Sequence, residues 1–166
     1  MNEKKFTLIV VALALVAIVV VILVNLPWGG DKAAIDKEYE SLDRDHVFES
    51  IDFDEFFRKI ENNETFQIYI GSNKLNQVEY FVAAANKYAK EREIKTIYYL
   101  RSSELTTEQL DTIKQASSLE ITLPTLMYWM SGETKSEAHH ISSLEKIENY
   151  PNWDALVRVY FERCYD

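Results

Sequence analysis

The sequence predicts an α/β domain, with a central mixed sheet flanked by helices, preceded by one transmembrane helix. The first thirty residues contain a long uncharged, apolar run. Strand-like and helix-like segments then alternate over residues 46–166, which is typical of a layered α/β fold. Of the 166 residues, 47% are hydrophobic and only 4 are Gly and 3 Pro, so the chain can build a core and is neither fibrous nor disordered.

Residues 6–26 are expected to form the transmembrane helix. They consist almost entirely of Leu, Ile, Val and Ala, and a helix of 21 residues rises ~32 Å, close to the ~30 Å hydrocarbon layer. A secretory hydrophobic region is usually only ~7–15 residues long. We therefore interpret the segment as an uncleaved anchor, with a long signal peptide as the alternative. Lys4 and Lys5 precede it, so the positive-inside rule places residues 1–5 in the cytoplasm and the domain outside the cell membrane.

Residues 27–45 are expected to form a stalk or linker between the anchor and a domain at 46–166. The stretch is charged and poor in large apolar residues. Ile35, Tyr39 and Leu42 have the spacing of one stripe on a short helix. The sequence therefore predicts a short stalk helix, with the folded domain starting near His46.

Charge and cysteine content exclude several classes of function. Residues 31–166 carry 16 Lys and Arg against 26 Asp and Glu. This acidic balance argues against nucleic acid and against an anionic membrane surface, so the expected lipid contact is that of the N-terminal helix. The single cysteine, Cys164, excludes a disulfide framework within one chain and a Cys-rich zinc site. The sequence contains no P-loop, GxSxG or dinucleotide motif, and we expect no cofactor.

The segments of the domain alternate in a defined order. They are a strand at 46–51, a helix at 53–60, a strand at 65–70, a helix at 75–92, a strand at 96–100, a helix at 106–116, a strand at 125–130, a strand at 135–142 and a helix from about 151. Asp52 with Glu55, and Thr106 with Gln109, are predicted capping boxes. Residues 131–133 (Ser-Gly-Glu) are the predicted hairpin turn. Short crossovers and one hairpin predict a mixed sheet covered on both faces.

Two junctions in this order carry a family resemblance. Residues 68–81 read IYIGSNKLNQVEYF, a strand that ends in a Gly turn before a helix. Residues 123–133 read LPTLMYWMSGE, in which Pro124 opens a strand that ends in a Gly turn. With the element order, they resemble the thioredoxin fold over residues 46–166. More narrowly, they resemble membrane-anchored thioredoxin-like proteins of Gram-positive bacteria, which include bacteriocin-transport accessory proteins. The resemblance implies a cis bond before Pro124 and contact of this loop with the turn at 73–78.

The thiol pair of that family is missing. Counted from Gly71, the two positions of its CxxC motif fall on Leu75 and Val78. Thiol–disulfide exchange needs an attacking thiolate, which neither side chain can supply. The buried acid that manages protons in thioredoxins falls on Tyr69, which also lacks that function. We therefore expect a thioredoxin-like fold that is redox-inactive and is not an enzyme.

Protein binding is the function that this combination predicts, as an accessory, scaffold or holdase-like module with a protein or peptide partner. In the thioredoxin fold the loop at the cis-proline presents backbone to extended peptides. The expected groove consists of Asn73, Lys74, Leu75, Asn76, Gln77, Val78, Leu123, Pro124 and Thr125. Two alternatives stay open. One is a thiol oxidoreductase that uses Cys164 or a partner's thiol; the other is a structural subunit of a secretion, competence or bacteriocin-export complex.

The remaining candidate residues have simpler structural interpretations. Cys164 lies on the apolar stripe of the last helix, which favours a small buried hydrophobic residue over a nucleophile. His139 and His140 are adjacent on a predicted strand, so they point to opposite faces and cannot chelate one metal ion together. His46 is distant in sequence, and we expect no metal site. Lys74 lies near a predicted helix N-terminus and could contact an anion, but it is expected to be an exposed turn lysine.

Overall fold

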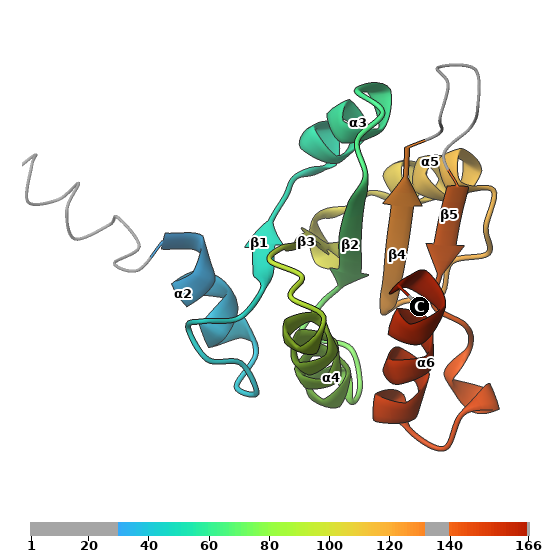
Figure 1. The fold of residues 1–166 in the computed structure, drawn as a ribbon. Helices are drawn as coiled ribbons and strands as arrows, with labels where there is room; N and C mark the ends of the chain where they lie inside the picture. Colours follow the sequence, from blue (N-terminus) through green and yellow to red (C-terminus); the bar gives the residue numbers. More distant parts are fainter. Residues whose placement is uncertain (1–29, 132–139, 166) are drawn as a thin grey trace, which may run out of the picture.

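The structure is a computed structural model that describes residues 30–131 and 140–165. In these residues one five-stranded sheet has the order β1-β3-β2-β4-β5 (Figure 1). The strands are β1 (Phe48–Ser50), β2 (Phe66–Gly71), β3 (Ile97–Arg101), β4 (Thr125–Met130) and β5 (His140–Ser143). β1, β3 and β2 run parallel to one another. β4 pairs antiparallel with β2, and β5 pairs antiparallel with β4. The α/β class with a central mixed sheet is therefore confirmed.

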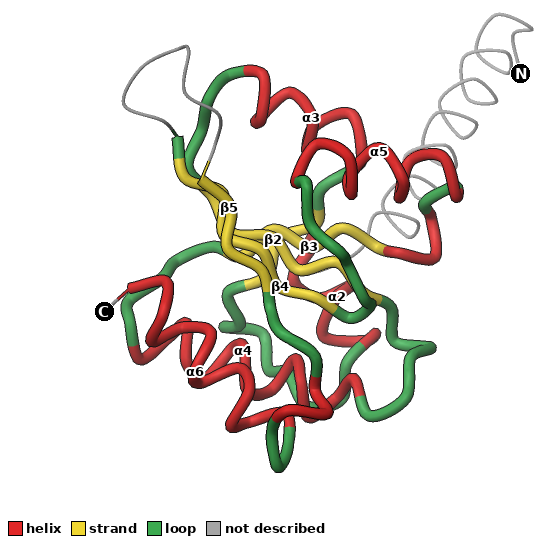
Figure 2. The backbone as a smooth tube through the Cα atoms, turned by 90° about the vertical axis from the view of Figure 1, so that its right-hand side faces the viewer, coloured by secondary structure: helices red, strands yellow, loops and turns green. Residues whose placement is uncertain are grey.

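Helices cover both faces of this sheet (Figure 2). On one face lie α3 (Phe53–Glu61) and α5 (Thr107–Ser117). On the other lie α4 (Val78–Glu91), α6 (Trp153–Tyr165) and an additional helix before the first strand, α2 (Gly30–Glu38). Two short 3₁₀ helices, η1 (Ser102–Glu104) and η2 (Ile147–Asn149), complete the connections.

Alternation along the strands creates one hydrophobic core on each face. Tyr99 packs in the core under α2, α4 and α6, while its neighbour Tyr98 packs against the core under α3 and α5. Tyr128 and Trp129 divide in the same way. One aromatic residue of each adjacent pair therefore packs on each face of the sheet.

The predicted capping box is complete at the start of α5, whereas at the start of α3 only its Asp52 half is present. The Asp52 carboxylate accepts a hydrogen bond of 2.7 Å from the backbone N–H of Glu55. Both bonds of the Thr106–Gln109 capping box are present, at 3.2 and 2.9 Å. One boundary needs correction: α4 begins at Val78 and not at Leu75. Gln77 has a left-handed backbone (φ 56°), which no α-helix can contain, so the residues before it form a turn.

The segment expected as a stalk also needs correction, because residues 30–45 pack on the domain. Ile35 and Tyr39 are fully buried and Leu42 is nearly so, all in the core that contains Tyr69 and Tyr99. Ser41 donates through its backbone N–H to Glu79 of α4, at 3.0 Å. The apolar stripe therefore packs on one face of the sheet. Within the described residues, the folded unit starts at Gly30.

Some predictions concern residues that the structure does not describe. The predicted transmembrane helix at 6–26, the cytoplasmic residues 1–5, most of the predicted hairpin turn and His139 lie outside the described residues. Within residues 30–131 and 140–165, none of the helices has the length and apolar character needed to cross a membrane.

Candidate functional site

The candidate site begins in the turn between β2 and α4. Ser72 is buried and organises the turn: its hydroxyl accepts from the backbone N–H of Lys74 at 3.2 Å, and its carbonyl accepts from that of Leu75 at 3.0 Å. Leu75 points back and packs against the core. The exposed residues of the turn are Asn73, Lys74, Asn76 and Gln77. The turn therefore presents amide groups and one ammonium group on a fixed backbone.

The proline loop lies at the same end of the sheet as this turn. The Leu123–Pro124 bond is cis, as predicted. Thr125 pairs with Ile70, so Pro124 comes beside the end of β2, where the turn starts. Leu123, however, packs against the core under α3 and α5, whereas Val78 is buried under α4 on the other face. The proline loop therefore starts beside the end of β2, while Leu123 and Val78 serve the two cores and offer little side chain to a ligand.

Tyr69 occupies the position predicted to replace a buried acid, and it is fully buried. Its ring folds along the strand over Gly71, where an added Cβ would overlap the Tyr69 hydroxyl. Glycine is therefore required at position 71 for this ring to fit. The hydroxyl lies 3.2 Å from that of Tyr39, so the side chain serves a buried hydrogen-bond network and not the surface of the turn.

That network runs from the centre of the sheet to α2. Tyr39 donates to Tyr99 at 2.8 Å, and Tyr99 donates to the Glu38 carboxylate at 3.1 Å. Since the proton of Tyr39 is directed at Tyr99, the remaining bond is donated by Tyr69 to Tyr39. Arg101 pairs with Glu38 at 2.7 Å. Burial, which disfavours the charged phenolate, raises the pKa of Tyr39, Tyr69 and Tyr99 above the usual value.

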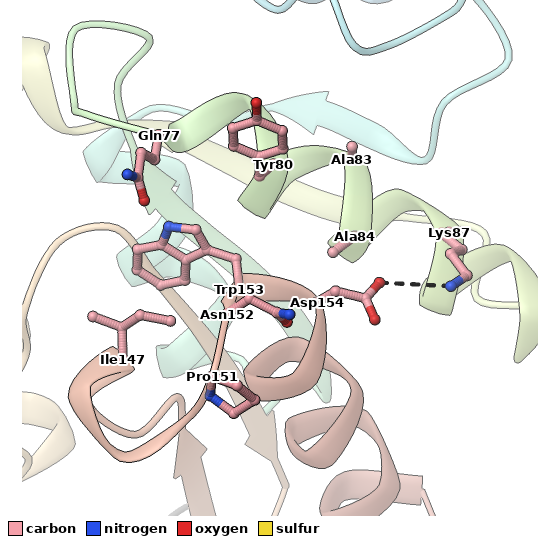
Figure 3. A pocket seen from close by; sticks show the side chains of 10 residues that line it. All are labelled: Gln77, Tyr80, Ala83, Ala84, Lys87, Ile147, Pro151, Asn152, Trp153 and Asp154. Carbon is pink, nitrogen blue, oxygen red and sulfur yellow. Dashed lines mark ion pairs between the residues drawn. The ribbon is translucent and has the colours of Figure 1, made fainter.

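An apolar pocket of about 620 Å³ opens beside the turn, between α4 and α6 (Figure 3). It is lined by Gln77, Tyr80, Ala83, Ala84, Lys87, Ile147, Pro151, Asn152, Trp153 and Asp154. The Trp153 ring packs edge-on against Phe81, with ring centroids 5.2 Å apart. Tyr80 stays 72% exposed at the rim. Because Gln77 belongs to both the turn and the pocket, the two form one continuous surface.

An ion pair and a hydrogen bond lie at one end of this pocket. The Lys87 ammonium lies 3.5 Å from the Asp154 carboxylate, and the Tyr88 hydroxyl donates to the same carboxylate at 2.9 Å. These charges neutralise each other, so the pocket interior is dominated by apolar and aromatic side chains. Sequence reasoning missed Tyr80 and Trp153 as surface residues. The available signal was that Tyr80 falls off the apolar stripe of its helix.

The other residues considered for chemistry lie elsewhere. Cys164 is half-buried against the core, ~16 Å along α6 from Trp153 at the helical rise of 1.5 Å per residue. His46 is fully buried: its Nδ1 accepts from the backbone N–H of Phe48 and its Nε2 donates to the carbonyl of Lys32. Over the described part of the chain, no three His, Cys, Asp or Glu side chains gather in a group that could hold a metal ion.

The turn and the pocket combine polar and apolar groups on one surface. The described residues supply exposed amides, an apolar hollow and an aromatic rim, and the turn carries neither a thiol nor a titratable carboxylate. No protein-family model matches the chain, and no curated protein matches it in sequence. The surface suits the binding of a polypeptide that brings an apolar side chain together with backbone hydrogen-bonding groups.

Proposed function

We propose that this protein is a membrane-anchored, redox-inactive thioredoxin-like module that binds another protein at the outer face of the cell membrane. The strand order β1-β3-β2-β4-β5 and the helices on both faces are compatible with a thioredoxin-like fold. The apolar run at 6–26 supports the anchor, and Lys4 and Lys5 support a cytoplasmic N-terminus. The role is that of an accessory or scaffold for an exported or membrane protein.

The observation that carries the proposal is the continuity of the thiol-less turn with the apolar pocket. A thioredoxin-like oxidoreductase needs a cysteine where β2 leads into the helix, and here the residues are Leu75 and Val78. What the turn adjoins instead is a hollow of about 620 Å³ with an exposed tyrosine at its rim. Exposed aromatic residues next to apolar hollows are typical anchors of protein interfaces.

The partner is an extended or loop segment of a protein that inserts one aliphatic or aromatic side chain. The side chain enters beside Trp153, while the partner's backbone bonds the amides of Asn73, Asn76 and Gln77. The pocket is too small for a folded domain, and its volume of about 620 Å³ lies in the range of pockets that take a drug-sized ligand. Binding thus relies on shape and hydrogen bonds, with little dependence on salt.

Capture from solubilised native membranes tests this proposal when pocket and control variants are compared. Ala83→Asp places a carboxylate in the pocket, whereas Ala116→Asp places the same group on the exposed surface of α5. We expect the wild type and Ala116→Asp to retain the same partner and Ala83→Asp to lose it at least tenfold, with unchanged circular dichroism. Equal capture by all three proteins would contradict a pocket-based interface.

The competing function is a thiol oxidoreductase that uses Cys164 or a partner's thiol. It requires Cys164 to be reached by a reagent in the folded protein. We expect slow labelling of Cys164 by a maleimide in the native state and fast labelling after denaturation, because the side chain packs against the core. Rapid native labelling combined with disulfide reductase activity would favour the oxidoreductase.

A further inference from the structure

The outer edge of the sheet at β1 is closed by side chains. β1 is the terminal strand and pairs on its inner side with β3. Val47 accepts from Ile97 at 2.9 Å, and Ile51 donates to Tyr99 at 3.0 Å, so the backbone groups of the odd-numbered residues face β3. In a parallel ladder the intervening residues point the other way. The N–H groups of Phe48 and Ser50 therefore face outward, along the edge.

Both outward N–H groups are bonded within the chain. Phe48 donates to Nδ1 of His46 at 3.1 Å, and Ser50 donates to the Asp31 carboxylate at 2.6 Å. The His46 ring is held in place by α2, because its Nε2 donates to the carbonyl of Lys32 at 2.9 Å. The Lys32 ammonium donates in return to the carbonyl of His46 at 2.6 Å. The two N–H groups that a further strand would need are therefore already bonded to acceptors within the chain.

Charged side chains surround the space outside these hydrogen bonds. A hollow of about 690 Å³ is lined by Asp31, Lys32, Ala33, Arg44, Glu49 and Ser50. Charged side chains beside an edge strand are a known means by which proteins discourage edge-to-edge pairing. An added strand would find the outward N–H groups of β1 already bonded within the chain. It would also have to displace α2, which is fixed in the core by Ile35 and Tyr39.

We propose that Asp31 and His46 form a seal that keeps β1 from pairing with β1 of a second copy of the chain. Every copy carries the same edge, so uncovered edges can pair antiparallel about a two-fold axis. The seal is independent of the proposed partner site, which lies at the turn and the α4–α6 pocket.

The seal is tested on the full chain in detergent micelles with variants of Asp31 and His46. Asp31→Ala removes one acceptor, and His46→Phe removes the other while keeping a ring in the buried site. Asp31→Asn retains an acceptor, and Asp36→Ala removes the same charge elsewhere on α2. The readouts are hydrogen exchange at the Ser50 amide and the dimer fraction by sedimentation.

We expect Ser50 to exchange about tenfold faster in Asp31→Ala than in the wild type, Asp31→Asn or Asp36→Ala. Asp31→Ala/His46→Phe should dimerise with rising concentration. Glu49→Cys in a Cys164→Ser background should then cross-link between copies with a short bismaleimide. If the double variant fails to fold, the proposal is judged on Asp31→Ala alone, by the exchange rate of its Ser50 amide and by its dimer fraction. A monomeric variant with wild-type exchange at Ser50, a dimer without this cross-link, or a wild type that already pairs through β1 would overturn the proposal.

Discussion

Tyr39 joins a helix outside the sheet to two strands at its centre. Its hydroxyl bonds those of Tyr69 on β2 and Tyr99 on β3, while its ring packs edge-on against both. The sequence predicted this residue in a stalk, because a short apolar stripe in a charged stretch does not show what it packs against. Only the folded structure shows that its hydroxyl meets a buried tyrosine hydroxyl on each of the two strands.

Tyr39→Phe should destabilise the protein by about 1–3 kcal/mol. The change preserves the ring but leaves the buried Tyr69 hydroxyl without its acceptor, and an unmet buried donor is costly. Urea unfolding monitored by circular dichroism measures the difference. Tyr80→Phe is the matched control, because Tyr80 is 72% exposed and its hydroxyl should matter by less than about 0.5 kcal/mol. Equal midpoints for the two variants would contradict the network.

The same tyrosines predict unfolding at alkaline pH. Burial raises the pKa of Tyr39, Tyr69 and Tyr99 above the ordinary value of 10.0. Below that value both states hold the protons and the stability is complete. Above it the unfolded chain loses protons first, so each such tyrosine costs ~1.4 kcal/mol per pH unit. Tyrosinate absorbance and loss of circular dichroism should therefore rise together above about pH 10. Full ionisation of all tyrosines in a folded protein would refute this.

At the scale of elements, the strands and caps were accessible from sequence. β-branched and aromatic runs marked β2 and β4, and Thr106 with Gln109 marked the start of α5. These signals are local, so they survive without knowledge of the tertiary fold. The start of α4 was missed because the left-handed Gln77 is set by the turn around Ser72, which side-chain periodicity does not report.

α2 and the pocket could not be predicted for a different reason. Ile35, Tyr39 and Leu42 are only three apolar positions, and their burial depends on a gap over β2 and β3 that exists only in the assembled sheet. The pocket likewise forms between α4 and α6, which are far apart in sequence. The cis-proline loop was predicted through a family resemblance. Leu123 and Val78 were predicted to line a groove, but each packs in or against one of the two cores.

Removal of α2 tests its place in the fold. Ile35, Tyr39 and Leu42 are almost completely buried, and each such side chain contributes ~1.5–3 kcal/mol. A fragment of residues 46–166 should therefore unfold at a much lower urea concentration than a fragment of residues 30–166, and should bind a hydrophobic dye. If both fragments unfold at the same concentration, α2 is a stalk after all.

At the scale of the whole molecule, the acidic charge is consistent with the proposed display of the domain on a membrane. An excess of carboxylates over residues 31–166 disfavours adhesion to anionic lipid, so the proposed partner protein would not compete with the bilayer surface. The proposed interface lies where the turn meets the pocket.

Protease added to intact protoplasts tests the proposed topology. With the N-terminus inside and the domain outside, the protease should degrade the domain while a cytoplasmic marker protein survives. Full protection of the domain would place it inside the cell. A soluble form that begins between residues 20 and 30 would instead indicate a cleaved signal peptide.

Binding at a turn without thiol chemistry is the central claim, and site-specific photo-cross-linking tests it most directly. A photoreactive amino acid is placed at Gln77, at the junction of turn and pocket, or at Gln115 on the exposed surface of α5. In native membranes we predict one defined adduct from position 77, none from position 115, and an undiminished adduct when Cys164 is changed to Ser. An adduct that disappears in Cys164→Ser, or equal adducts from both positions, would contradict the account.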